Sequence, residues 1–153
     1  MSIVGIGPVL AIVGAIAALL VAVADKIIGV TLSLTAPWRE WACALGVILM
    51  AIGVIFWFSS VVLVKKAYGS HRLTTTGVYG ISRNPMYAAF IVFIVPGVAL
   101  VVNELMLLLV AVAMFVVFKL RIGLEEEYLA REFGVAFDEY RRSVSQLLPF
   151  IRI

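Results

Sequence analysis

The sequence predicts an all-α integral membrane protein with about four transmembrane helices. Hydrophobic residues make up 64% of the 153 residues and charged residues only 14%, whereas a soluble domain is about half apolar and roughly a quarter charged. The uncharged residues are gathered into four runs, and the charged residues lie mainly between and after those runs. A chain of this length and composition is expected to form one membrane domain, with no room for a second.

The first two runs, residues 1–24 and 41–64, are each long enough to cross the bilayer. A helix needs about 20 apolar residues to span a hydrocarbon core of ~30 Å. Residues 1–24 have no basic leader and no obvious small-residue cleavage site, so we interpret them as an anchor helix rather than a secretory signal. The connecting stretch 26–38 is apolar enough to lie along the membrane interface.

The last two runs, residues 84–103 and 105–118, are predicted to form a tight antiparallel hairpin, because only Asn103 and Glu104 separate them. The second run reaches only ~21 Å as a helix. It must therefore borrow flanking residues, with Lys119 and Arg121 extending to the interface, or thin the bilayer locally. A re-entrant hairpin that never fully crosses is the alternative.

Charge predicts the orientation of these helices. The loop 65–83 contains four basic residues and no acidic residue, and the stretch from Lys119 to the C-terminus holds six Lys or Arg. The connector 25–40 has two basic and two acidic residues. Because Lys and Arg near span ends favour the cytoplasmic side, we expect both termini and the polar loop 65–83 to be cytoplasmic, with Glu104 on the opposite side.

The polar tail, residues 121–149, is predicted to be an amphipathic helical region that is bent or broken near Gly134. Its apolar residues recur at three- and four-residue spacing: Leu129, Phe133, Ala136, Phe137, Tyr140 and Val144. Such a helix lies on the membrane surface or caps the bundle. From the pattern alone, capping without a functional site is the simpler interpretation.

Two polar segments, 71–87 and 121–149, flank the predicted hairpin and carry an ordered set of motifs. They contain, in order, a histidine, L-x-T-x-G-x-Y, S-R-N-P-x-Y and R-x-x-x-E-E-x-x-L-x-x-x-F-G. This order resembles the isoprenylcysteine carboxyl methyltransferase family and, more loosely, the membrane phospholipid methyltransferases. The matching positions are His71, Leu73, Thr75, Gly77, Tyr79, Ser82, Arg83, Asn84, Pro85, Tyr87, Arg121, Glu125, Glu126, Leu129, Phe133, Gly134 and Tyr140.

The sequence departs from the family pattern at four positions. Phe137 stands where a tyrosine is usual, Gln146 where arginine is frequent, and Val78 where proline is common. Asn84, in place of histidine, is a frequent bacterial-type variant. We expect the inner (plasma) membrane of a prokaryote as the location.

The resemblance implies S-adenosyl-L-methionine as the methyl donor, bound at the cytoplasmic face between the loop and the C-terminal helix. The implied cofactor-binding residues are His71, Leu73, Thr75, Gly77, Tyr79, Asn84, Pro85, Tyr87, Glu125, Glu126 and Tyr140. The implied catalytic residues are Arg121, Glu125, Glu126 and Arg83. No metal site and no nucleic-acid partner are expected. Residues 1–64 would be two helices with an interfacial connector, and 65–153 the methyltransferase core, made of the cofactor loop 65–87, the hairpin 84–120 and the C-terminal region 121–149.

The acceptor is expected to be lipophilic or lipidated. The sequence does not choose among the chemical groups that could receive the methyl group. A carboxylate, as in a prenylated cysteine or similar lipid acid, needs a cation to hold it, and Arg121 or Arg83 would serve. A phospholipid amine, the alternative, must lose a proton, to Glu126 for example; a small thiol is a further option. Phe90, Phe93 and Met114 could line a lipid tunnel between the last two helices, although ordinary helix packing is the simpler interpretation.

Two other classes of protein are alternatives to an enzyme. A non-catalytic membrane scaffold could retain the same fold and motifs. A small transporter is disfavoured, because transport pathways usually expose an ionisable residue within the membrane, and the first two runs contain none except the thiol of Cys43.

Overall fold

A computed structural model describes residues 5–29, 31–68 and 73–148. The regular structure of these residues is helical, as the sequence predicts. The α-helices are α1 (Gly7–Ile28), α2 (Trp38–Tyr68), α3 (Pro85–Ala88), α4 (Val95–Val101), α5 (Leu108–Phe133) and α6 (Val135–Ser143). A π-helical segment, Ala89–Ile94, joins α3 to α4, and 3-10 turns occur at Gly77–Gly80 and Leu105–Leu107.

Three helical segments of the described chain are long and apolar enough to cross a membrane. They are Gly7–Ile28, Trp38–Ala67 and Leu105–Phe133, and a shorter apolar helical stretch covers Pro85–Val101. In the predicted hairpin, the second helical segment is therefore the longer one and the first is the shorter one, which is the opposite of the prediction. The run that was expected to be short continues well beyond residue 118, whereas the preceding run is the shorter one.

Residues 121–133 were predicted to belong to a separate tail helix, and they are instead the second half of α5. The helix passes through Gly123, which costs only ~1 kcal/mol relative to alanine and is followed by good helix formers. The predicted break at Gly134 is confirmed: its φ of 52° lies in the left-handed region, where glycine has no steric penalty. The chain turns there into α6.

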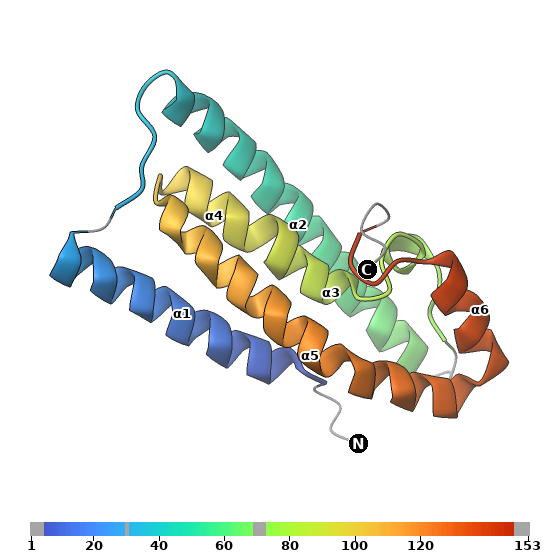
Figure 1. The fold of residues 1–153 in the computed structure, drawn as a ribbon. Coiled ribbons are helices and arrows are strands. Elements are labelled where there is room, and N and C mark those ends of the chain that lie inside the picture. Colours follow the sequence, from blue (N-terminus) through green and yellow to red (C-terminus); the bar gives the residue numbers. More distant parts are fainter. Residues whose placement is uncertain (1–4, 30, 69–72, 149–153) are drawn as a thin grey trace.

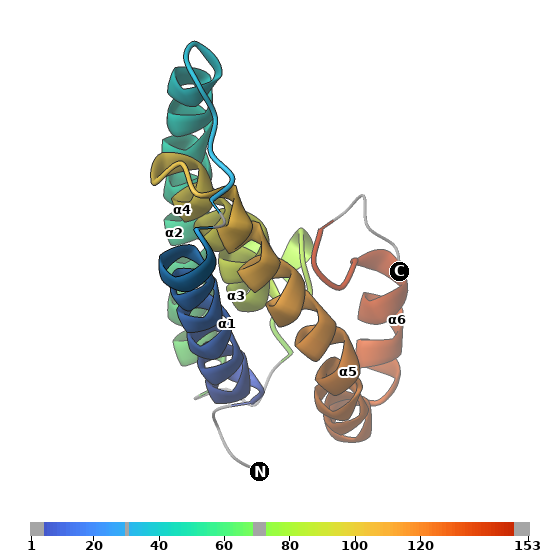
Figure 2. The ribbon, with the colours of Figure 1, turned by 60° about the vertical axis from the view of Figure 1, so that its left-hand side comes forward.

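In the bundle, α4 and α5 lie side by side at the centre, α2 packs along α4, and α1 packs along α5 (Figure 1). Helix α6 and the segment after it return to the end of the bundle where α3 begins, and Figure 2 shows α6 beside the last turns of α5. Pro85 occupies the first turn of α3, a position where its missing N–H costs nothing.

Glycines allow α2 and α4 to pack closely. A Cβ atom added to Gly46 would lie 2.6 Å from the carbonyl oxygen of Gly97, and one added to Gly97 would lie 2.8 Å from that of Gly46. A Cβ on Gly53, two turns along α2, would lie 2.6 Å from the side chain of Ile94. Small residues at a membrane helix interface let the backbones approach and pack in this way.

Replacing Gly97 with valine is therefore expected to destabilise the protein by ~1–3 kcal/mol, the usual cost of overpacking. The measurement is thermal unfolding in detergent. Gly123→Ala is the control, because nothing lies within 4 Å of a Cβ at Gly123 and alanine favours a helix. Equal unfolding temperatures for Gly97→Val and the unmodified protein would contradict the close approach of α2 and α4.

The connector between α1 and α2 is bound to the turn between α4 and α5. The side chain of Asn103 accepts from the Leu34 N–H at 2.9 Å and donates to the Leu34 carbonyl at 3.1 Å. The Leu105 N–H also donates to the Leu32 carbonyl at 2.8 Å. The stretch 26–38 was predicted to be interfacial. Its first residues end α1, Leu32 and Leu34 belong to this hydrogen-bonded connector, and Trp38 begins α2.

Candidate active site

A buried ion pair joins the start of α3 to α5. Nη2 of Arg83 lies 2.9 Å from Oε1 of Glu126, and the two side chains are only 10% and 15% exposed. Nη1 of Arg83 donates to the carbonyl of Arg141 at 3.1 Å, whereas its Nε is buried and has no partner among the described residues. Burial lowers the pKa of the Arg83 guanidinium, and the charge of Glu126 opposes this shift. An arginine stays protonated in proteins, so the pair is ionic.

Gln146 connects the segment after α6 to this ion pair. Its backbone carbonyl accepts from Ser82 Oγ at 3.3 Å and from Asn84 Nδ2 at 3.1 Å. Its side chain donates from Nε2 to Glu126 at 3.0 Å and accepts at Oε1 from Lys119 Nζ at 2.8 Å. Gln146, one of the four positions at which the sequence departs from the family pattern, is therefore one of the residues that connect the tail to the rest of the site.

Glu125 points to a different part of the protein from Glu126. Successive helical residues are about 100° apart around the axis, and Glu125 accepts a hydrogen bond from the Tyr87 hydroxyl at 3.0 Å and another from the Ile6 backbone N–H. The Tyr87 ring packs edge-on against Phe118 with ring centroids 5.7 Å apart. Among the described residues none is a cationic partner that neutralises the charge of Glu125.

Two tyrosines link the loop to α6. The Tyr140 hydroxyl donates to the carbonyl of Tyr79 at 2.7 Å, and the Tyr140 ring contacts buried Phe137. Burial, followed by the negative charge of Glu125, raises the pKa of Tyr79 to about 12. Burial also raises the pKa of Tyr140. Both phenols are therefore neutral near pH 7.

The remaining predicted site residues are not joined to the polar network by any of the hydrogen bonds described above. Leu73 is half-buried, and Thr75 and Gly77 are exposed; the φ of 63° at Gly77 requires a residue such as glycine. Arg121 is exposed on α5 and has no ion pair within the described residues, so it is not part of the Arg83–Glu126 network. His71 lies outside the described residues.

An apolar cavity of about 340 Å³ lies between α1, the stretch Pro85–Val101 and α5. It is lined by Leu10, Ala11, Gly14, Ala15, Ala18, Phe90, Val95, Val98, Leu107, Val110 and Met114. Phe90 and Met114 thus line this cavity, whereas Phe93 takes part in ordinary helix packing, the simpler of the two interpretations of the sequence. Its ring packs against Phe56 of α2, with centroids 5.3 Å apart, because the π-helical segment turns Phe93 toward α2.

Sequence reasoning missed three contributors to these contacts. Lys119 had been interpreted only as a cation at the end of a span, and Gln146 only as a departure from a pattern. The backbone N–H of Ile6, which binds Glu125, carries no sequence signal at all. For Lys119 the available signal was its position, seven residues before Glu126 and hence on the same side of a continuous helix.

The apolar helices and the buried polar network at one end of the bundle define an integral membrane protein with a polar site between a loop and its last helices. The sequence model of the phospholipid methyltransferase family matches residues 41–136, which is more than half of the chain. The chain belongs to this family.

The chain is also similar to isoprenylcysteine methyltransferases, which confirms the resemblance seen in its motifs. It is 31% identical over 120 residues to protein-S-isoprenylcysteine O-methyltransferase A of Arabidopsis thaliana, covering 72% of this chain and 61% of the relative. It is 36% identical over 94 residues to the enzyme of that name from Saccharomyces cerevisiae, covering 61% and 39%. For the Xenopus laevis relative, identity is 30% over 122 residues, covering 73% and 42%. The chain therefore spans less than two thirds of the length of these relatives.

Proposed function

We propose that this protein transfers a methyl group from S-adenosyl-L-methionine to an acceptor with a long apolar chain. The carboxylate of a prenylated cysteine is the first candidate for the methylated group. The observation that carries this proposal is the position of the apolar cavity, whose wall includes Leu10. One helical turn away, Ile6 contacts the carboxylate of Glu125. The names of the similar proteins in Arabidopsis and yeast support the same acceptor.

The charged groups of the site fit the cofactor. When bound, S-adenosyl-L-methionine supplies an activated methyl group on a sulfonium, and the molecule also carries an ammonium and a carboxylate. Glu125, which lacks a cationic partner in the described chain, offers a negative charge to the cationic groups. Glu126 is already paired with Arg83, and we therefore assign cofactor binding to Glu125 and support of the site to Glu126.

The cavity fits an apolar chain. Its volume of about 340 Å³ falls in the ~300–1,000 Å³ range of ligand pockets, and apolar side chains line it. An acceptor lying in the cavity would extend its reacting group toward the polar end of the bundle. Transfer from an activated donor needs little besides alignment and exclusion of water, and the packed rings of Tyr87 and Phe118 can exclude water on the side of α5.

A phospholipid amine is the second candidate acceptor, favoured by the family model. An amine must be deprotonated before it attacks. The sequence suggested Glu126 as the base, but the structure pairs its carboxylate with Arg83. Labelled cofactor incubated with the purified protein and a membrane lipid extract, followed by mass spectrometry, distinguishes methyl ester from N-methyl products.

The enzyme proposal itself is tested by calorimetry on the protein in detergent. We expect the cofactor or its demethylated product to bind with a micromolar Kd, roughly −8 kcal/mol. A well-folded protein that binds neither compound at millimolar concentration would refute the enzyme and favour the non-catalytic scaffold.

We also propose that both chain termini and the site face the cytoplasm. The start of α1 and the start of α3 lie at one end of the bundle, and the turn between α4 and α5 lies at the other (Figure 1). Cysteine accessibility in intact cells tests this orientation in a Cys43→Ala background. Ser2→Cys should be protected from a membrane-impermeant reagent, and Val102→Cys, which replaces an exposed residue, should react. Labelling of both positions from the same side would contradict the topology.

A further inference from the structure

We propose that Lys119 is a specificity-determining residue, whose ammonium binds the anionic group of the acceptor while Gln146 positions it. This inference rests on the proposed function and deepens it, because it selects a carboxylate acceptor over an amine. It also replaces the sequence-based assignment of this role to Arg121 or Arg83.

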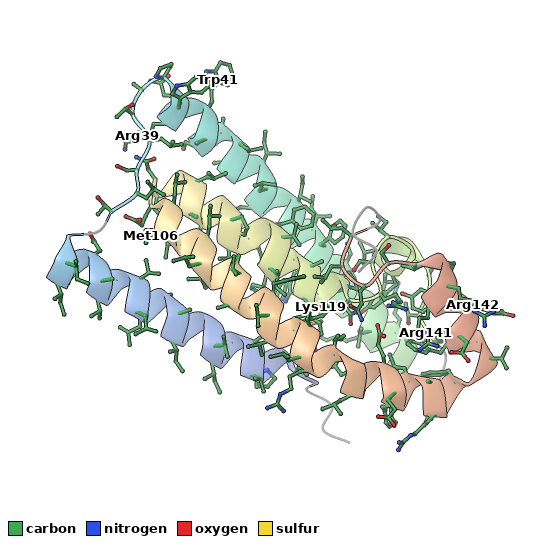
Figure 3. All side chains as sticks on the ribbon, in the orientation of Figure 1. Arg39, Trp41, Met106, Lys119, Arg141 and Arg142 are labelled. Atoms are coloured by element: carbon green, nitrogen blue, oxygen red, sulfur yellow. The ribbon has the colours of Figure 1, made fainter. Side chains whose placement is uncertain are left out.

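Lys119 lies on the side of α5 that faces the polar network. Lys119 and Glu126 are seven residues apart, close to two turns of ~3.6 residues each, so both side chains project from the same side of the helix. Nζ of Lys119 lies 2.8 Å from Oε1 of Gln146. Figure 3 shows Lys119 at the end of the bundle that also carries Arg141 and Arg142, far from Arg39 and Trp41.

The ammonium of Lys119 has binding capacity to spare. An ammonium has three N–H donors, and the described residues provide one partner, the neutral amide of Gln146. No carboxylate of the described chain forms an ion pair with Lys119, since Glu126 is held by Arg83. The half-buried charge of Lys119 is therefore oriented by a hydrogen bond and is not neutralised by any residue that the structure describes.

The residue at position 146 decides whether Lys119 can be held in this way. The side-chain oxygen of Gln146 accepts from Lys119 and its nitrogen donates to Glu126. An arginine has no acceptor atom and would bring a second positive charge next to Lys119. Glutamine at position 146 therefore adds no second cation beside Lys119, and its side-chain oxygen orients the Lys119 ammonium.

The other two basic candidates are less suitable. Arg83 directs Nη2 to Glu126 and Nη1 to the Arg141 carbonyl, and its Nε is enclosed by the protein. Arg121 is exposed and is separated from Lys119 by about 200° around the helix axis. Of these three cations, Lys119 is half-buried, forms no ion pair with a described residue and has a single hydrogen-bond partner among them.

Lys119 also lies at the right depth for a lipid acceptor. It is the first charged residue of α5 after the uncharged stretch that ends at Phe118, so it marks the place where the apolar part of the helix ends. An acceptor whose chain lies among apolar side chains would bring its polar group to this level. A carboxylate there gains a charge-assisted hydrogen bond, whereas a protonated amine would meet a like charge.

The test compares the binding of two ligands that differ only in charge. The probes are an N-acetylated S-prenylcysteine with a free carboxylate and the corresponding carboxamide, titrated against the full chain in detergent. We expect the unmodified protein to bind the acid at least ~10-fold more tightly than the amide, as one charge-assisted hydrogen bond implies. Lys119→Met should abolish this preference, and Lys119→Arg should retain part of it.

Two further variants separate a direct role from a structural one. Gln146→Leu removes the side-chain bonds to Lys119 and Glu126 but keeps the backbone carbonyl that binds Ser82 and Asn84; it should reduce the preference without abolishing it. Lys66→Met makes the same charge change at an exposed position in the last turn of α2 and should leave the preference unchanged. In turnover, Lys119→Met should raise KM for the acid and leave the Kd of the cofactor unaltered.

The outcomes are distinguishable. An unchanged acid preference in Lys119→Met, or equal loss of affinity for acid and amide, overturns the role of Lys119 while leaving the proposed methyl transfer standing. If the unmodified protein binds the cofactor but neither prenylcysteine probe, the proposed acceptor is wrong and the role of Lys119 falls with it.

Discussion

Replacing Arg83 with methionine is expected to lower the free energy of unfolding by about 3–5 kcal/mol, because removing one partner of a buried ion pair leaves the other charge without compensation. The remaining group would be Glu126, which is 15% exposed. The variant would also lose the bond from Arg83 to the Arg141 carbonyl and loosen α6. Thermal and denaturant unfolding in detergent measure the effect.

A double variant and a variant of an exposed ion pair are the controls for this prediction. Arg83→Met combined with Glu126→Leu removes both charges and should recover much of the lost stability. Arg131→Met breaks the pair with Glu127, whose side chains are 77% and 59% exposed, and exposed pairs contribute only ~0–1 kcal/mol. If Arg83→Met and Arg131→Met unfold at the same temperature, the Arg83–Glu126 pair does not hold the site together.

The helical class and several helix boundaries could be predicted because they depend on local chemistry. Long uncharged runs must be helical in a membrane, where every backbone polar group needs an internal partner. Pro85 is suited to a first helical turn, and Gly134 to a backbone with positive φ. These features were predicted correctly from single residues and their neighbours.

The partners of the individual site residues could not be predicted, because they depend on how α5 is rotated against its neighbours. Glu125 and Glu126 are adjacent and chemically identical in the sequence. The folded chain directs Glu125 to Tyr87 and α1, and Glu126 to Arg83 and Gln146. The four-residue spacing of Arg121 and Glu125 puts both on one side of a continuous helix, and α5 is continuous there, but spacing cannot tell that Arg121 is exposed.

Glu125→Gln is expected to weaken cofactor binding by roughly 10- to 150-fold, the equivalent of a charge-assisted hydrogen bond of ~1.5–3 kcal/mol. The reason is that Glu125 provides the carboxylate without a cationic partner, and a glutamine in its place loses the charge. The glutamine oxygen can still accept from Tyr87, so the fold should be little affected. Calorimetry in detergent gives the Kd, and the unfolding temperature reports on the fold.

Matched variants on the same helix decide whether the effect belongs to Glu125. Glu127→Gln makes the same change at an exposed position and should leave the Kd unaltered. Arg121→Ala, four residues before Glu125, should also leave it nearly intact, because an exposed arginine outside the polar network has no contact through which to hold the cofactor. Loss of cofactor binding in Arg121→Ala together with a normal Kd in Glu125→Gln would reverse these two roles. It would mean that α5 binds the carboxylate of the cofactor through Arg121, rather than its cationic groups through Glu125.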